Sequence, residues 1–154
     1  MWTRQWLHLR KIPIIVMLKI LFGKWNGGLA LNNLNKKEDP VREKRIEQEI
    51  TVDGYDASER AMGWYYYLQD KLGFPFRACC IAERIISPLK KNEKVQVMGM
   101  APEEDCEKEM FVEVVWQGKD FAVSLTQLKG VEADGETQEV IGDWHYWIAR
   151  GYEF

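Results

Sequence analysis

Two segments in the first half of the chain repeat their apolar residues with the period of an α-helix. Residues 41–50 place Ile46 and Ile50 four positions apart among alternating charges, which predicts a short exposed helix. A longer helix is expected to begin after Asp56, because Asp56 and Glu59 form a capping signature, and to end at Gly73. Its predicted apolar face consists of Ala61, Tyr65, Leu68 and Leu72.

A third helical pattern closes the chain. Asp134 is the expected N-cap, and the apolar face that follows ends before Gly151. The members of that face are Val140, Ile141, Trp144, Trp147 and Ile148. The aromatic run Trp64–Tyr67 is expected to supply core and half-buried rim, since four consecutive rings fan out around a helix and do not form one stacking platform.

Between these helices the period changes to that of β-strands. Short alternating or β-branched stretches occupy 76–83, 95–100, 110–116 and 121–125, with a fifth at 128–131. Gly118 lies in a tight hairpin, Gln117–Asp120, and a longer loop joins the first two strands. These elements predict an α+β fold: a small, strongly bent antiparallel β-barrel of SH3-like type, flanked by N-terminal and C-terminal helices.

Charge divides the 154 residues into two unlike parts. Residues 1–37 carry seven bases and no acid, so residues 38–154 hold 14 bases against 24 acids, net −10. We therefore expect a basic, partly apolar, poorly ordered extension at 1–40 and an acidic domain at 41–154. Such a domain is a poor partner for nucleic acid or an anionic membrane, and a suitable one for cations or basic protein surfaces.

The apolar run in the extension, 12–22, is too short to span a bilayer. It is broken by Pro13 and Lys19, whereas a span needs roughly 20 apolar residues. It faintly resembles a secretory signal, although Lys19 argues against one. Two other interpretations are equally well supported: a peripheral basic amphipathic tail, or a stretch that precedes a translation start at Met17 or beyond.

The candidate chemistry lies between the second and third predicted strands. Five of the seven residues from Glu103 to Glu109 are carboxylates, opposed only by Lys108. A hard divalent cation relieves the repulsion among them, although an ordinary solvated acidic turn is the alternative. If the first two strands are antiparallel, the loop lies near the C-terminal end of the longer helix, where Asp70 meets the negative end of the helix dipole. The alternative for Asp70 is a surface pair with Lys71 or Arg77.

Other site chemistries do not fit the sequence. The stretch from Asp53 lacks the ligand positions of an EF-hand, and the two histidines and three cysteines are not at zinc-ligand spacing. Asp143 and His145 are too close on one helix to form a dyad; His145 is expected at the rim, and Asp143 has no acidic loop assigned to it. No hydrolase or nucleotide-binding motif occurs, so we expect no enzyme. The odd cysteine count favours a reduced, cytoplasmic setting.

Four separated motifs, in order, resemble the CcbP-like calcium-binding proteins, a cyanobacterial family without EF-hands. The resemblance covers residues 41–154. Its motifs are the stretches 61–68, 74–83, 97–111 and 143–147. It implies a small acidic cytoplasmic protein that buffers or senses calcium through surface carboxylates on a compact β-rich fold.

The predicted ligand is therefore Ca²⁺. We expect neither a nucleic-acid partner nor a transmembrane segment. Its candidate metal ligands are Asp70, Glu103, Glu104, Asp105, Glu107 and Glu109. The resemblance supports the acidic loop, and Asp70 follows from the predicted topology. The alternative function is an SH3-like interaction module that binds a basic peptide or protein.

Overall fold

From residue 40 onward the elements follow the order that the sequence patterns predict. The computed structural model describes residues 37–154, so most of the predicted extension, 1–40, lies outside the described residues. The elements are α4 (Pro40–Arg45), the π-helical turn η1 (Ile46–Ile50), α5 (Ala57–Lys71), β1 (Phe76–Cys80), β2 (Lys94–Met100), the 3₁₀ turn η2 (Glu103–Asp105), β3 (Phe111–Trp116), β4 (Lys119–Ser124), the 3₁₀ turn η3 (Leu125–Gln127), β5 (Leu128–Glu132) and α6 (Gly135–Ala149).

The helix starts form at the predicted caps. The Asp56 carboxylate accepts from the Glu59 amide at 2.9 Å, and Glu59 reaches back to accept from the Tyr55 amide at 2.8 Å. The Asp134 carboxylate accepts from the Thr137 amide at 2.8 Å, which lowers the pKa of Asp134. Both carboxylates satisfy amides that have no partner within the first turn.

The five strands form one antiparallel sheet in the order β4-β3-β2-β1-β5. Strands β1 and β2 pair antiparallel, as expected, with Phe76 opposite Val97. At the β3–β4 hairpin Gln117 and Gly118 both have positive φ (49° and 73°), a conformation that suits a two-residue turn. Because the ladder ends at β4 on one side and at β5 on the other, the sheet is not closed, and the predicted SH3-like barrel is not confirmed.

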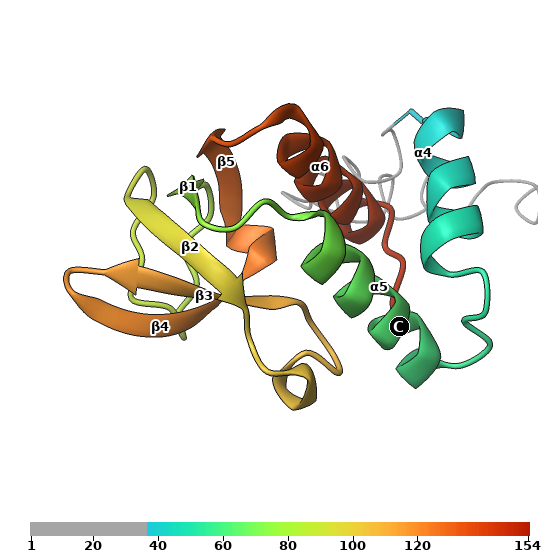
Figure 1. Cartoon of the computed structure of the whole chain (residues 1–154), viewed down its shortest axis with the longest axis horizontal. Helices are drawn as coiled ribbons and strands as arrows, with labels where there is room; N and C mark the ends of the chain where they lie inside the picture. Colours follow the sequence, from blue (N-terminus) through green and yellow to red (C-terminus); the bar gives the residue numbers. More distant parts are fainter. Residues whose placement is uncertain (1–36) are drawn as a thin grey trace, which may run out of the picture. The chain divides into compact units, whose positions relative to one another are not determined.

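Helices α5 and α6 lie side by side against the sheet, and α4 packs on their far side (Figure 1). The rings of Trp64 on α5 and Trp144 on α6 meet edge to face, with their centroids 5.2 Å apart. A Cβ at Gly63 would overlap the Ile50 carbonyl, so glycine allows η1 to approach α5 closely. Tyr66 is exposed while its neighbours are buried or half-buried, which confirms the expected core and rim.

No helix within residues 37–154 is long and apolar enough to cross a membrane.

Candidate metal centre

The acidic loop, residues 101–110, is fixed to the core by its apolar members. Ala101, Cys106 and Met110 are fully buried. The Ala101 carbonyl accepts from the Tyr65 hydroxyl at 3.0 Å, and burial raises the pKa of both Tyr65 and Cys106. The backbone of the loop is therefore held in place while its charged side chains point outward.

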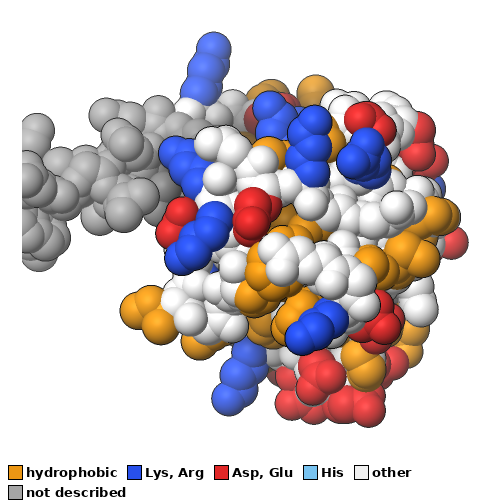
Figure 2. Space-filling view, turned by 90° about the vertical axis from the view of Figure 1, so that its left-hand side faces the viewer, with side chains coloured by type: hydrophobic (Ala, Val, Ile, Leu, Met, Phe, Trp, Pro, Cys, Tyr) orange, Lys and Arg blue, Asp and Glu red, His pale blue; other side chains and the backbone are white. Residues whose placement is uncertain are grey.

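The carboxylates of the acidic loop leave it in different directions. Glu103, Glu104 and Asp105 are consecutive residues of the η2 turn, and a 3₁₀ turn spaces successive side chains about 120° apart. All three are exposed, as is Glu107. Figure 2 shows acidic side chains gathered at the lower end of its face, the level at which Figure 1 places η2.

Glu103 ties the loop to helix α5. Its carboxylate accepts from the Tyr66 hydroxyl at 2.8 Å, and this hydrogen bond raises the pKa of Tyr66. The contact is made in the middle of α5, one turn before Asp70. A cation that captures Glu103 would therefore compete with a neutral phenol and not with a charged group.

Glu109 is already in an ion pair within the protein. Its carboxylate pairs with the Arg84 guanidinium at 2.5 Å and accepts from the Ser124 hydroxyl at 2.5 Å. Arg84 comes from the β1–β2 loop and is separated from Glu109 by 25 positions in the sequence. Of the six predicted ligands, Glu109 is thus the one that a metal ion could take only by displacing an internal positive charge.

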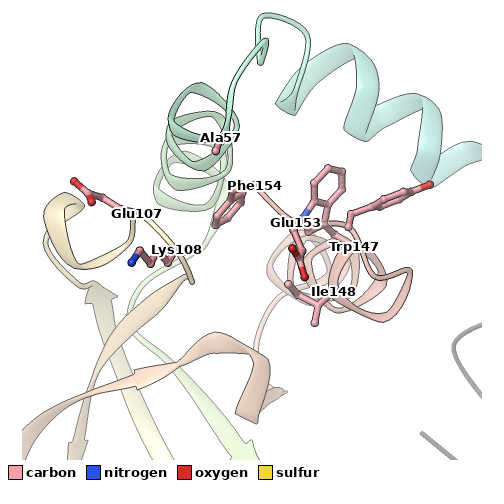
Figure 3. A pocket seen from close by; sticks show the side chains of 8 residues that line it. Ala57, Glu107, Lys108, Trp147, Ile148, Glu153 and Phe154 are labelled. Carbon is pink, nitrogen blue, oxygen red and sulfur yellow. The ribbon is translucent and has the colours of Figure 1, made fainter. Parts of the chain in front are cut away.

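Asp105 and Glu107 line two separate hollows. Asp105 borders a groove of about 540 Å³ together with Glu113 and Asp120, which the sequence interpretation did not select. Glu107 borders a cavity of about 340 Å³ between the acidic loop and the end of the chain. Figure 3 shows Glu107 and Lys108 on one side of this cavity, with Trp147 and Ile148 on the other.

Asp70 lies exposed in the last turn of α5. It follows Tyr66 by four residues, so the helix places both on the same face. The alternative partners predicted for Asp70 are engaged elsewhere, since Lys71 pairs with Glu136 at 3.5 Å and Arg77 with Glu132 at 3.4 Å.

The predicted ligands lie in one region of the surface, but their side chains do not converge on a single site. Within residues 37–154, no three Asp, Glu, His or Cys side chains are grouped so that they could hold a metal ion. The carboxylates of the acidic loop would have to turn toward one another to share an ion. Because they are exposed, they can do so without disturbing the core.

One carboxylate that the sequence interpretation set aside lies at the centre of the helices. Asp143 is fully buried and binds Arg42 at 2.9 Å and Arg45 at 2.7 and 2.8 Å, while Tyr67 donates to it at 3.2 Å. It joins α4, α5 and α6. The available signal was its position on the apolar face, one residue before Trp144.

Histidine 145 is half-buried, at the rim of the core as expected, with its Nε2 2.7 Å from the Leu128 carbonyl.

Comparison with known proteins points to one family. Residues 44–148 match the family model of CcbP-type calcium-binding proteins. The crystal structure of Anabaena CcbP is similar, with 45% identity and a TM-score of 0.71 over 78% of this chain and 98% of that chain. A calcium-binding protein in its calcium-binding form matches with 45% identity and a TM-score of 0.69 over 76% and 96% of the two chains. Among curated proteins there is no match.

Proposed function

The chain belongs to the CcbP family of calcium-binding proteins, and from this premise we propose that it binds Ca²⁺ reversibly through its acidic loop. The family and a structural neighbour in its calcium-binding form support calcium as the ion. The charge pattern of this surface supports the location: Glu103, Glu104, Asp105 and Glu107 are exposed within five consecutive residues.

The observation that carries this location is the lack of neutralising cations. In the part of the chain that the structure describes, none of these four carboxylates is in an ion pair, whereas Glu109 is paired with Arg84. Calcium takes six to eight oxygens in a flexible shell at about 2.3–2.6 Å, which exposed carboxylates, backbone carbonyls and water supply together. The ligand set that we propose is Glu103, Glu104, Asp105 and Glu107, with Asp70 and Glu109 as outer contributors.

An open site of this kind binds weakly. Its side chains lose conformational entropy when they converge, and much of the coordination shell remains water. We propose a dissociation constant on the order of micromolar or poorer, suited to a buffer or a reversible sensor and not to an enzyme. Free Cys79, Cys80 and Cys106 support a reducing, cytoplasmic location.

Calorimetry with Ca²⁺ and with Mg²⁺ on the full chain tests the proposal. We expect saturable calcium binding and weak competition by magnesium, because Mg²⁺ requires a near-octahedral shell that exposed side chains do not preform. Equal affinities for the two ions would indicate diffuse charge attraction and would contradict a calcium site.

A second candidate function has one observation in its favour. The groove beside Asp105 combines apolar Met98 and Phe121 with the carboxylates of Glu113 and Asp120, a lining that suits a basic peptide. The register shift in the β2–β3 pair, between Val97 and Gly99, bends the sheet beside this groove. Titration with a lysine-rich peptide in the presence of a calcium chelator tests this alternative: saturable binding would favour the interaction module.

A further inference from the structure

The β1–β2 loop carries two isoleucines at its outermost point. Ile85 and Ile86 are 106% and 77% exposed. They occupy the central positions of a turn that the Ser87 amide closes by donating to the Arg84 carbonyl at 3.0 Å. Turn centres favour Gly, Pro, Asn and Asp, and β-branched apolar residues are unusual there. We call the segment Arg84–Ser87 the isoleucine tip.

The base of this loop is well anchored, so the isoleucine tip projects from a fixed position. Leu89 is buried, and the Asn92 amide donates to the Cys80 carbonyl at 2.8 Å. Gln127 donates to the Ala82 carbonyl at 2.9 Å from the other side. Anchoring at both ends lowers the entropy lost when the tip docks.

Bases outnumber acids in the segment that carries the isoleucine tip, in contrast to the acidic domain as a whole. Residues 82–94 contain four bases and two acids. Glu83 draws the second half of the loop toward the turn, since it pairs with the Lys90 ammonium at 3.8 Å and accepts from the Lys91 amide at 3.2 Å. Lys90 and Lys91 are exposed. The net charge of −10 for residues 38–154 therefore does not describe this projection, which is apolar and has an excess of two bases over residues 82–94.

We propose that the isoleucine tip is a membrane contact that inserts into the surface of an anionic bilayer. A convex apolar turn needs a partner that deforms around it, and a bilayer accepts such a group without a complementary groove. Lysines beside the inserted group face the anionic headgroups, where each adds attraction. A bilayer therefore fits this surface better than a folded protein partner does.

The Arg84–Glu109 ion pair places the acidic loop next to this contact. Without metal the loop carboxylates repel an anionic surface, so membrane binding is weak. Calcium bound at the acidic loop removes that repulsion, which makes membrane binding calcium-dependent. This coupling rests on the proposed function.

Flotation of the full chain with vesicles tests the proposal. The vesicles contain phosphatidylcholine with or without phosphatidylserine, and each is tested with Ca²⁺, Mg²⁺ or a chelator. We expect binding to the anionic vesicles in calcium, and about tenfold weaker binding for the Ile85→Ser/Ile86→Ser variant because most of the inserted apolar surface is gone. The control Val52→Ser/Tyr55→Ser changes two other exposed apolar residues, 59% and 87% exposed, and should bind like the wild type.

Calorimetry without vesicles separates the two proposals. Suppose that the wild type and the Ile85→Ser/Ile86→Ser variant have the same calcium affinity and the same degree of flotation. The isoleucine tip is then not the membrane contact, and the proposed calcium site is retained. If no calcium heat is seen, the proposed function fails on its own. Equal flotation in calcium and in chelator would overturn the coupling between the two loops.

Discussion

Asp143 and the acidic loop use the same chemical group in opposite ways. Asp143 is fully buried, and two arginines and a tyrosine bind its oxygens. Glu104 and its neighbours on the loop are exposed, and within residues 37–154 no ion pair neutralises four of them. A buried carboxylate with charged partners has its coordination complete and holds helices together. Exposed carboxylates without charged partners keep their oxygens available for an external ion.

The difference shows that a high density of carboxylates in a segment does not identify the carboxylate that contributes most to the stability of the fold. Arg45 binds Asp143 through two nitrogens, a bidentate geometry that also raises the pKa of Arg45. The acidic loop has five carboxylates, yet only Glu109 forms an ion pair within the described residues. Stability and metal binding should therefore respond to different substitutions.

Replacing Asp143 by Asn should give the largest effect, and on stability. The substitution removes the buried carboxylate that two partly buried arginines share and leaves them only the more exposed partners Asp39 and Glu139, which costs about 3 kcal/mol of unfolding free energy. Urea denaturation without calcium measures it, with Glu104→Gln as the control of equal charge change. A loss below about 1 kcal/mol would be typical of a surface pair and would show that Asp39 and Glu139 are sufficient to balance the two arginines.

Changing Glu103, Glu104, Asp105 and Glu107 together to the corresponding amides should act on calcium binding instead. We expect affinity to fall at least tenfold, about 1.4 kcal/mol, because the main ligand oxygens lose their charge. Stability without metal should stay equal or rise slightly, since repulsion within the acidic loop decreases. Calorimetry and urea denaturation measure the two properties; unchanged affinity would exclude this loop as a ligand source.

Arg84→Ala tests the internal cation of the loop. Removing it frees Glu109 and deletes a positive charge beside the site, so calcium affinity should rise about threefold, as expected for a partly exposed pair. The matched control is Arg77→Ala, which removes the same charge from a surface pair with Glu132. If both variants gain affinity equally, the effect is general electrostatics and Glu109 takes no part.

Asp70→Asn should give the smallest change, about a twofold loss of calcium affinity, because Asp70 stands one turn beyond the Tyr66–Glu103 contact. Asp143→Asn is unsuitable as a control of equal charge change, because the loss of Asp143 would also destabilise the fold. Exposed Asp53, in the turn before α5, is the suitable control. Equal effects of Asp70→Asn and Asp53→Asn on calorimetric affinity would remove Asp70 from the site.

Local patterns were enough to predict most of the secondary structure. The caps at Asp56 and Asp134, the helix periods and the strand alternation are all interactions between residues a few positions apart, so the sequence displays them directly. The antiparallel pairing of β1 with β2 was part of the predicted fold class, and the structure confirms it. Closure into a barrel did not follow, because it depends on pairing between the outermost strands.

The sequence by itself determined where the carboxylates of the acidic loop are, and the tertiary structure decided which of them are already occupied. Asp143 meets Arg42 and Arg45 across 101 and 98 positions, and Glu109 meets Arg84 across 25. Such partners are set by how helices and loops pack, which no local period encodes. The η2 turn likewise decides that neighbouring carboxylates diverge, since side-chain direction depends on backbone geometry and not on spacing along the chain.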